Sequence, residues 1–402
     1  MTTVAELDLP QLDLFDAELR GPRFHAVMLD LADRTWIAES PLAFVVLDRE
    51  AGSFFLRSKR CSFPGLKIAE LFGIEDGPLH EEIVRNILHV NADDHRRLRN
   101  LVNPAFTPRA AERWRPAMRG FLEGLHHRVR DAGGCEFVEA FAKPYPSLTI
   151  ATVMGAPLGD APPLHEWSNW IQRQFDGPSL MTERERIEQA VAEFYDYAGA
   201  LVARRREDPG DDLISTLIAA RFEGDKLTDS ELVNLVLNVL VGGVDTTQSQ
   251  LAQGIRLLAE HPGQWDLVRA DPEARVPRAV EEILRFEPIT PFTARIVEEE
   301  IVYRDVVFPV DTVVMVCAFT ANREPGEADA FDVLAEREGK PLTFGAGTHY
   351  CLGANLARAE LQEALAFLAR RWKRIELAGE PVMGSINGIY GIDALPIRWD
   401  AA

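Results

Sequence analysis

Most of the chain carries the periodicity of amphipathic helices. Apolar residues recur every three to four positions over residues 122–129, 187–205 and 354–372. Such spacing places the apolar side chains on one face of a helix, where they can pack against a core. The pattern predicts that helices make up the larger part of the fold.

Material typical of strands is less abundant. Residues 42–47 and 53–56 are rich in β-branched and aromatic side chains and flank a turn-like segment, as in a hairpin. Similar runs lie within residues 301–316 and near the C-terminus. We therefore expect a mainly α fold with a minor β portion, near residues 40–60 and 296–316.

The longest helix has a recognisable start. Thr228-Asp229-Ser230-Glu231 has the form of a capping box, in which Thr228 accepts from the amide three residues on and Glu231 reaches back. Leu227 and Leu232 can pack together as a hydrophobic staple. The helix is expected to run to about His261, a length of roughly 50 Å at about 1.5 Å per residue.

Nothing in the sequence divides the chain into separate units. No repeat, low-complexity tract or Gly/Ser linker interrupts it. The apolar stretch over residues 232–244 contains Asn234 and Asn238 and is too short to span a bilayer. We expect one domain over residues 1–402.

Charge narrows the choice of partners. The chain has 43 basic and 63 acidic residues, a formal net charge of -20, which argues against a nucleic-acid binder. Basic residues nevertheless cluster around Arg96, Arg97 and Arg109. Such a cluster is usually a solvated face, and a docking site for an acidic partner protein is the alternative.

The cysteines and the N-terminus indicate a compartment. Cys61, Cys135, Cys317 and Cys351 lie far apart with no C-x-x-C pair, so neither a disulfide framework nor a zinc ribbon is indicated. The first residues carry acids throughout and lack the basic start and apolar run of a signal peptide or membrane anchor. The sequence predicts a cytoplasmic protein without an anchor.

One cysteine lies in a loop with unusual chemistry. Residues 344–353 read FGAGTHYCLG and are followed at once by a helical stretch. A helix N-terminus favours a thiolate, although a lone cysteine there is usually a small buried apolar residue. The three glycines allow a tight turn close to a flat cofactor, whereas no phosphate-loop spacing fits. A metal-bound thiolate is the chemical hypothesis.

The ten residues resemble the haem-binding loop of the cytochrome P450 family, F-G-x-G-x-H-x-C-x-G, of the bacterial, soluble, ferredoxin-dependent type. The resemblance implies the family's triangular, mostly helical prism and haem b as cofactor. It makes Cys351 the axial ligand of the iron and His349 a partner of a haem propionate. It also places Phe344 and Gly353 against the haem.

A second match lies in the capped helix, at Gly242-Gly243-Val244-Asp245-Thr246-Thr247. Two glycines within a helix cost about 1 kcal/mol each relative to alanine. Close helix packing would explain them, and so would a helix that opens beside a cofactor. The hexad resembles the family's oxygen-binding segment, with Gly242 beside the haem and Asp245 and Thr246 as its catalytic acid-alcohol pair.

A third match is the pair Glu282 and Arg285, whose i, i+3 spacing alone indicates only a surface ion pair. It resembles the family's structural E-x-x-R pair. The meander that normally adds a basic residue to this pair reads Asp329-Ala330-Phe331, with no base. Arg323 and Arg337 are the two candidates to replace it.

A fourth match concerns anion binding. His95 and Arg99 lie at i, i+4 on one helical face, which by itself indicates a solvated basic face. They resemble the family's H-x-x-x-R pair, which binds the haem propionates, and Arg295 falls where the family supplies a further partner. Such side chains suit carboxylates because their hydrogen bonds are charge-assisted.

The substrate-facing segments of the family indicate a largely apolar pocket, although for any one residue an ordinary core position is about as probable. The residues at these positions are Leu66, Leu71, Phe72, Ile87, Leu237, Val241, Ile289, Phe292 and Ile389.

The resemblance, which extends over roughly residues 43–399, implies a monooxygenase that uses dioxygen to hydroxylate or otherwise oxidise a hydrophobic small molecule. Electrons would come from a ferredoxin and its NAD(P)H-dependent reductase, with the basic cluster as the docking face. The alternative is a peroxide-driven haem-thiolate peroxygenase, which needs no redox partner. A gas sensor or a peroxide isomerase would not need the acid-alcohol pair.

Overall fold

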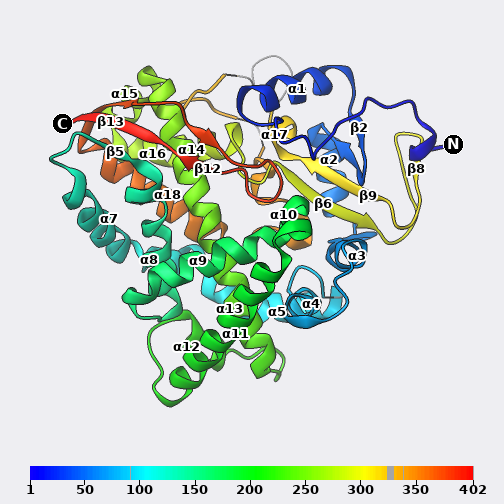
Figure 1. Ribbon diagram of the computed structural model, residues 1–402, viewed down its shortest axis with the longest axis horizontal. Coiled ribbons are helices and arrows are strands. Elements are labelled where there is room, and N and C mark those ends of the chain that lie inside the picture. Colours follow the sequence, from blue (N-terminus) through cyan, green and yellow to red (C-terminus); the bar gives the residue numbers. More distant parts are fainter. Residues whose placement is uncertain (91, 324–329, 338, 402) are drawn as a thin grey trace.

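Helices fill one side of the molecule and a small sheet the other, with the two termini at opposite ends of the longest axis (Figure 1). The computed structural model describes residues 1–90, 92–323, 330–337 and 339–401. The helices are α1 (Gly21–Arg34), α2 (Arg49–Arg57), α3 (Gly65–Leu71), α4 (Gly77–Arg85), α5 (Ala92–Val102), α6 (Pro108–Glu112), α7 (Arg115–Val129), α8 (Pro144–Met154), α9 (Ala161–Gln172), α10 (Gly177–Thr182), α11 (Arg184–Glu207), α12 (Leu213–Ala219), α13 (Asp229–Gly243), α14 (Asp245–Glu260), α15 (Pro262–Ala270), α16 (Pro272–Phe286), α17 (Ala318–Ala321) and α18 (Ala354–Ala369).

The main sheet has the strand order β2-β3-β9-β6-β4, in which β3 and β9 run parallel and the other pairs antiparallel. The other strands of the described residues form three further small sheets. The strands are β1 (Thr2–Thr3), β2 (Ile37–Ser40), β3 (Ala43–Val46), β4 (Cys61–Ser62), β5 (Gly134–Glu136), β6 (Phe292–Val297), β7 (Ile301–Tyr303), β8 (Val306–Phe308), β9 (Val313–Cys317), β10 (Trp372–Leu377), β11 (Val382–Met383), β12 (Ile392–Ala394) and β13 (Pro396–Ala401). The mainly α fold with a minor β portion is confirmed.

The predicted hairpin is wrong in its second strand. The strand β3 pairs with the preceding β2, and residues 53–56 lie in α2. The Asp48 carboxylate accepts a hydrogen bond from the backbone N of Ala51 at 2.8 Å, which caps the helix. Ala51 and Phe55, four residues apart, are both fully buried, so a helical face outweighs the strand preference of the aromatic side chains.

The long helix begins and ends close to the predicted positions, but it is interrupted. The Thr228 hydroxyl accepts from the backbone N of Glu231, and the Glu231 carboxylate accepts from the backbone N of Thr228, so the capping box is confirmed. At Val244 the backbone departs from ideal helical angles, with φ -92° and ψ -70°, but stays in the right-handed region, and α13 gives way to α14. The bend falls within the glycine-containing hexad.

The helix α14 lies in the interior of the helical part, where it packs against α8, α9, α16 and α18 (Figure 1). The helix α18 in turn packs against α7 and α16. This arrangement brings the hexad and the cysteine loop to the same buried region. Among the described helices, none is long and apolar enough to cross a membrane. The single domain over residues 1–402 stays a prediction.

Candidate active site

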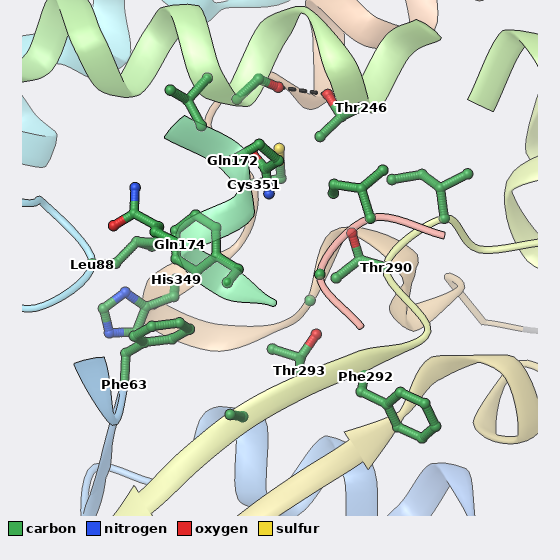
Figure 2. Close-up of a pocket in the computed structure, with 18 of the residues that line it drawn as sticks. Phe63, Leu88, Gln172, Gln174, Thr246, Thr290, Phe292, Thr293, His349 and Cys351 are labelled. Atoms are coloured by element: carbon green, nitrogen blue, oxygen red, sulfur yellow. Dashed lines mark hydrogen bonds between the residues drawn. The ribbon is translucent and has the colours of Figure 1, made fainter. Parts of the chain in front are cut away.

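A cavity of about 530 Å³ lies between α13, α18 and the strand β6 (Figure 2). Cys351 and Thr246 both line it, although they are 105 residues apart in the chain. Apolar side chains from α3, from the segment after α4 and from α13 form much of the remaining wall. The cavity therefore joins the candidate metal ligand and the candidate proton-delivering residue in one enclosed space.

The cysteine loop is shaped by its glycines. Gly345 and Gly347 have φ of 68° and 71°, in the left-handed region that favours glycine. A Cβ on Gly347 would also lie 2.8 Å from the carbonyl oxygen of Leu56. The backbone N of Cys351 donates to the Phe344 carbonyl at 2.9 Å, which closes the loop just before α18 begins.

The thiol of Cys351 faces the cavity from the N-terminal end of α18 (Figure 2). Burial raises the pKa of this thiol, and the backbone amides of Gly353 and Ala354 with the guanidinium groups of Arg99 and Arg358 partly lower it. A metal ion would complete the stabilisation of a thiolate, because a coordinated thiol loses its proton. The surroundings suit a metal-bound sulfur rather than an inert core cysteine.

Four basic side chains converge near the cysteine loop, namely His95, Arg99, Arg295 and His349. The His95 and His349 rings lie 4.4 Å apart, and the Nδ1 atom of each is buried without a hydrogen-bond partner among the described residues. Nη2 of Arg99 donates to the carbonyl of Tyr350, and Nη1 of Arg295 to that of Ala294. Three of the four, all except His95, line the cavity.

Burial shifts the pKa of each of these groups downward, and for the two histidines neighbouring basic groups add to the shift. Burial lowers the pKa of Arg295 to about 10, and that of Arg99 in the same direction. Burial and then the neighbouring cations lower the pKa of His95 to about 4 and that of His349 to about 3. A ligand carrying carboxylates would relieve this repulsion.

These residues fit haem. A cavity-facing thiol at a helix N-terminus would suit a ligand of the haem iron, and the two arginines and two histidines would offer hydrogen-bond donors to its two propionate groups. The space beside Gly242 is open, since a Cβ there would meet no atom within 4 Å, and Gly353 is equally open. The predicted cofactor-binding residues are therefore gathered at one site.

The two glycines of the hexad serve different purposes. A Cβ on Gly243 would lie 2.4 Å from Cδ1 of Ile150, so this glycine allows α13 to pack closely on α8. Gly242 instead leaves the cavity side of the helix open. Its carbonyl accepts from the Thr246 hydroxyl at 2.6 Å, which fixes that hydroxyl at the cavity wall (Figure 2).

Asp245 points away from the cavity. It is 4% exposed, and its Oδ2 accepts from the Ser168 hydroxyl of α9 at 2.6 Å. Burial raises the pKa of Asp245, while Ser168 and the nearby His165 and Arg173 oppose that rise. Oδ1 has no hydrogen-bond partner among the described residues. The acid and the alcohol of the predicted pair thus face opposite sides of the helix.

The pair Glu282 and Arg285 is buried and bidentate. Each side chain is 5% exposed, and Nε and Nη2 of Arg285 donate to the two carboxylate oxygens at 2.7 Å. Nη2 of Arg337 donates to Oε1 of Glu282 at 3.0 Å, so Arg337 replaces the base missing at Ala330. Arg323 instead donates to backbone carbonyls of α16 and α17.

Most of the predicted pocket residues line the cavity. Leu66 does not: it is 52% exposed on the outer face of α3, while its neighbours Lys67 and Ile68 line the cavity. A helix turns by about 100° per residue, so an error of one position moves a side chain to another face. The predicted residues that do line it are Leu71, Phe72, Ile87, Leu237, Val241, Ile289, Phe292 and Ile389.

Sequence reasoning missed the polar residues of the cavity wall, Glu82, Gln172, Gln174 and Glu360. Glu360 is 1% exposed and accepts from the Thr247 hydroxyl at 3.3 Å, and burial raises its pKa well above the ordinary value. Glu360 lies between the apolar residues Ala359 and Leu361 of an expected helix, which was a usable signal. No comparable local signal marks the other three.

Comparisons with known proteins agree with this geometry. The cytochrome P450 family profile matches residues 78–273 and 275–380. Luteothin monooxygenase of Streptomyces thioluteus is 36% identical over 405 residues, covering 98% of this chain and 97% of that protein. The 6-deoxyerythronolide B hydroxylase of Saccharopolyspora erythraea is 36% identical over 334 residues, covering 79% of this chain and 80% of that protein.

The fold agrees as well. The crystal structure of CalO2 superimposes with a TM-score of 0.89 at 29% identity, covering 98% of this chain and 99% of that one. The predicted P450 fold is confirmed. The chain belongs to the cytochrome P450 family and is a haem-thiolate monooxygenase, which binds haem b and uses dioxygen to oxidise a mainly hydrophobic small molecule.

Proposed function

We propose that Cys351 is the axial thiolate ligand of the haem and that His95, Arg99, Arg295 and His349 hold its propionates. The observation that carries this assignment is the convergence of one cavity-facing thiol with Arg99, Arg295 and His349 at the cavity and with the buried His95 behind His349. Bound haem supplies oxygen activation, and a thiolate ligand favours cleavage of the O–O bond. The other functional residues control protons, water and substrate.

Proton delivery is assigned to Thr246 and Asp245. The Thr246 hydroxyl lies at the cavity wall and donates to the Gly242 carbonyl; by turning from that carbonyl it would be able to donate to a group bound in the cavity. Asp245 lies on a side of α14 that faces away from the cavity, where its Oδ2 accepts a hydrogen bond from Ser168 of α9. Its Oδ1 has no hydrogen-bond partner among the described residues and can accept a proton on that side. The two residues thus connect the cavity with the protein behind the helix.

The electron donor we propose is a ferredoxin with its NAD(P)H-dependent reductase, acting in the cytoplasm. Arg96 and Arg109 are exposed and available to an acidic partner. Arg97 is less suited than expected, since it forms ion pairs with Asp225 and Glu231. The proposed docking face therefore includes Arg96 and Arg109 but not Arg97 of the basic cluster.

Reconstitution tests this proposal. The purified holoprotein should show the red-shifted ferrous-CO band of a thiolate complex and should oxidise hydrophobic substrates when supplied with ferredoxin, reductase and NADPH. Arg96→Glu with Arg109→Glu should raise the KM for ferredoxin, while Arg97→Glu should act mainly on stability. Turnover with hydrogen peroxide alone, at rates equal to those with the redox partners, would overturn the proposed electron route.

A further inference from the structure

One part of the cavity wall is polar and buried. Glu82 of α4, Asn86 at the end of α4, Asn238 of α13 and Gln174 of the short 3₁₀ helix Arg173–Phe175 all line the cavity. Figure 2 shows Gln174 among the side chains around the cavity, beside Leu88. Glu82 is 0% and Gln174 5% exposed, so solvent outside the cavity does not reach them.

Both asparagine side chains, those of Asn86 and Asn238, donate a hydrogen bond to Glu82. Oδ1 of Asn86 accepts from the backbone N of Leu88 at 3.0 Å, and Oδ1 of Asn238 accepts from the backbone N of Ile87 at 3.3 Å. These contacts fix the orientation of both amides, whose nitrogens donate to Oε1 of Glu82 at 2.6 Å and 3.4 Å. One oxygen of the carboxyl group is therefore held by two amides.

The second oxygen of the Glu82 carboxyl group is buried and is not held by either asparagine. Oε2 of Glu82 has no hydrogen-bond partner among the described residues, and neither has Nε2 of Gln174. The Gln174 amide still approaches the carboxyl closely enough to lower its pKa, although neither atom completes a hydrogen bond. Buried polar atoms in proteins are nearly always paired, so a free acceptor beside a free donor indicates a missing partner.

We propose that Glu82 and Gln174 bind a hydroxyl or carboxamide group of an otherwise hydrophobic substrate. Such a group donates and accepts at once, which complements a carboxyl oxygen next to an amide N–H. The inference rests on the proposed function, since it names the class of compound that the monooxygenase oxidises. The polar pair would fix which end of the substrate lies away from the haem.

The charge of the site supports a neutral ligand group. Burial raises the pKa of Glu82 to about 7, against the hydrogen bonds of Asn86 and Asn238 and the nearby Gln174 amide. A hydroxyl or carboxamide can pair with the carboxyl in either protonation state, because it can reverse its roles. A ligand carboxylate would be repelled by the ionised form, and an alkane would leave both polar atoms unpaired.

Binding of matched probes to the holoenzyme tests the proposal. The probes are 1-decanol, decanamide, decanoic acid and n-decane, with dissociation constants from calorimetry and from the Soret spin shift. The alcohol and the amide should bind the wild type about tenfold more tightly than the alkane, as one or two net hydrogen bonds allow. Decanoic acid should bind more weakly than the alcohol at pH 8.

Single substitutions test which residues cause the preference for the alcohol and the amide over the alkane. Gln174→Met and Glu82→Met should bring the alkane-to-alcohol ratio close to one while the alkane affinity changes less than about twofold. Gln172→Met is the matched control, because Gln172 also lines the cavity two residues earlier in the chain, and it should keep the preference. The ferrous-CO spectrum checks that each variant is folded, and Gln174→Met remains decisive if Glu82→Met does not fold.

Several results would overturn the inference. Equal affinities in the wild type would show that an ordered water satisfies the pair, and a preference that survives both substitutions would place the polar contact elsewhere. The strongest binding by decanoic acid would point to an anion site instead. These outcomes do not depend on turnover, so a failed ferredoxin reconstitution with an intact alcohol preference would refute the electron route alone.

Discussion

Arg337 should stabilise the core beside the haem, because it provides the charge that the meander lacks at Ala330. Its Nη2 donates to Oε1 of Glu282 and to the carbonyl of Ala330, both at 3.0 Å. Glu282 is also held by Arg285 and by the backbone N of Asp332, at 3.0 Å. Replacing Arg337 by alanine removes one of three partners of a buried carboxylate.

The structure sets the size of the effect. A hydrogen bond to a charged group is worth about 1.5–3 kcal/mol, but the Arg337 side chain is 25% exposed, which reduces that value. We expect Arg337→Ala to lower the free energy of unfolding by about 1–2 kcal/mol. Glu282→Ala or Arg285→Ala should cost about 3–5 kcal/mol and prevent recovery of folded holoprotein, because each strands a buried charge.

Urea unfolding of the holoprotein, followed by far-ultraviolet circular dichroism and by the Soret band, measures the change. A double-mutant cycle of Arg337→Ala with Glu282→Gln should give a coupling of about 1 kcal/mol. Arg323→Ala is the control, since Arg323 donates to the carbonyls of Phe319 and Phe286 and should show no coupling to Glu282. Coupling to Arg323 rather than Arg337 would refute the assignment.

The same contact predicts a dependence on pH. Burial raises the pKa of Glu282, but hydrogen bonds from Arg285, Arg337 and the Asp332 amide outweigh it, and the net shift is downward from 4.5. A carboxyl whose folded-state pKa is depressed stabilises the protein above its unfolded-state value and loses that effect on acidification. The difference between wild type and Arg337→Ala should be full at neutral pH and shrink below pH 4.5.

The remaining predictions concern the site. Cys351→Ser should load haem poorly and lack the red-shifted ferrous-CO band, and persistence of that band would contradict the ligand assignment. Thr246→Ala should keep the substrate-induced spin shift but divert reducing equivalents into hydrogen peroxide, measured as product and peroxide per NAD(P)H; unchanged coupling would mean another proton route. Asp245→Asn should slow turnover at normal haem content, because an amide cannot relay a proton as a carboxylate does, and an unchanged rate would exclude that role. Gly243→Ala should lower the melting temperature, because its Cβ would lie 2.4 Å from a side-chain carbon of α8. The Cβ of Gly242→Ala would meet nothing within 4 Å, so this variant should weaken ligand-induced spin shifts instead. A loss of stability in Gly242→Ala and weaker spin shifts in Gly243→Ala would refute the different roles assigned to the two glycines.

The features that could be predicted from sequence are those written in contiguous residues. The capping box at Thr228 and the contact between Glu282 and Arg285 each need only local spacing, and both are present in the structure, although the spacing did not show that the pair is buried. Asp329, the first residue of the meander triplet, lies outside the described residues. Its neighbour Ala330 is described, and the Ala330 carbonyl accepts from Arg285 and Arg337.

Features that depend on tertiary contacts could not be predicted from the sequence. Residues 53–56 suit a strand or a helix equally well, and the Asp48 cap and burial of Phe55 decide in favour of the helix. The choice between Arg323 and Arg337 depends on how the chain returns to Glu282 after 55 residues. The polar pair in the cavity wall requires the packing of three elements, none of which carries its signature alone.

The four basic side chains near Cys351 show why fold and cofactor depend on each other. Arg295 is 2% exposed, and burial holds the pKa of its guanidinium near 10, so the charge is kept at a cost to stability. His95 and His349 are driven toward their neutral forms by the same crowding. A ligand with two carboxylates offsets both effects, and by mass action whatever binds the folded state stabilises it. The sequence supplies the residue types. Only their convergence from α5, β6 and the loop before α18 indicates a site for a ligand that carries carboxylates.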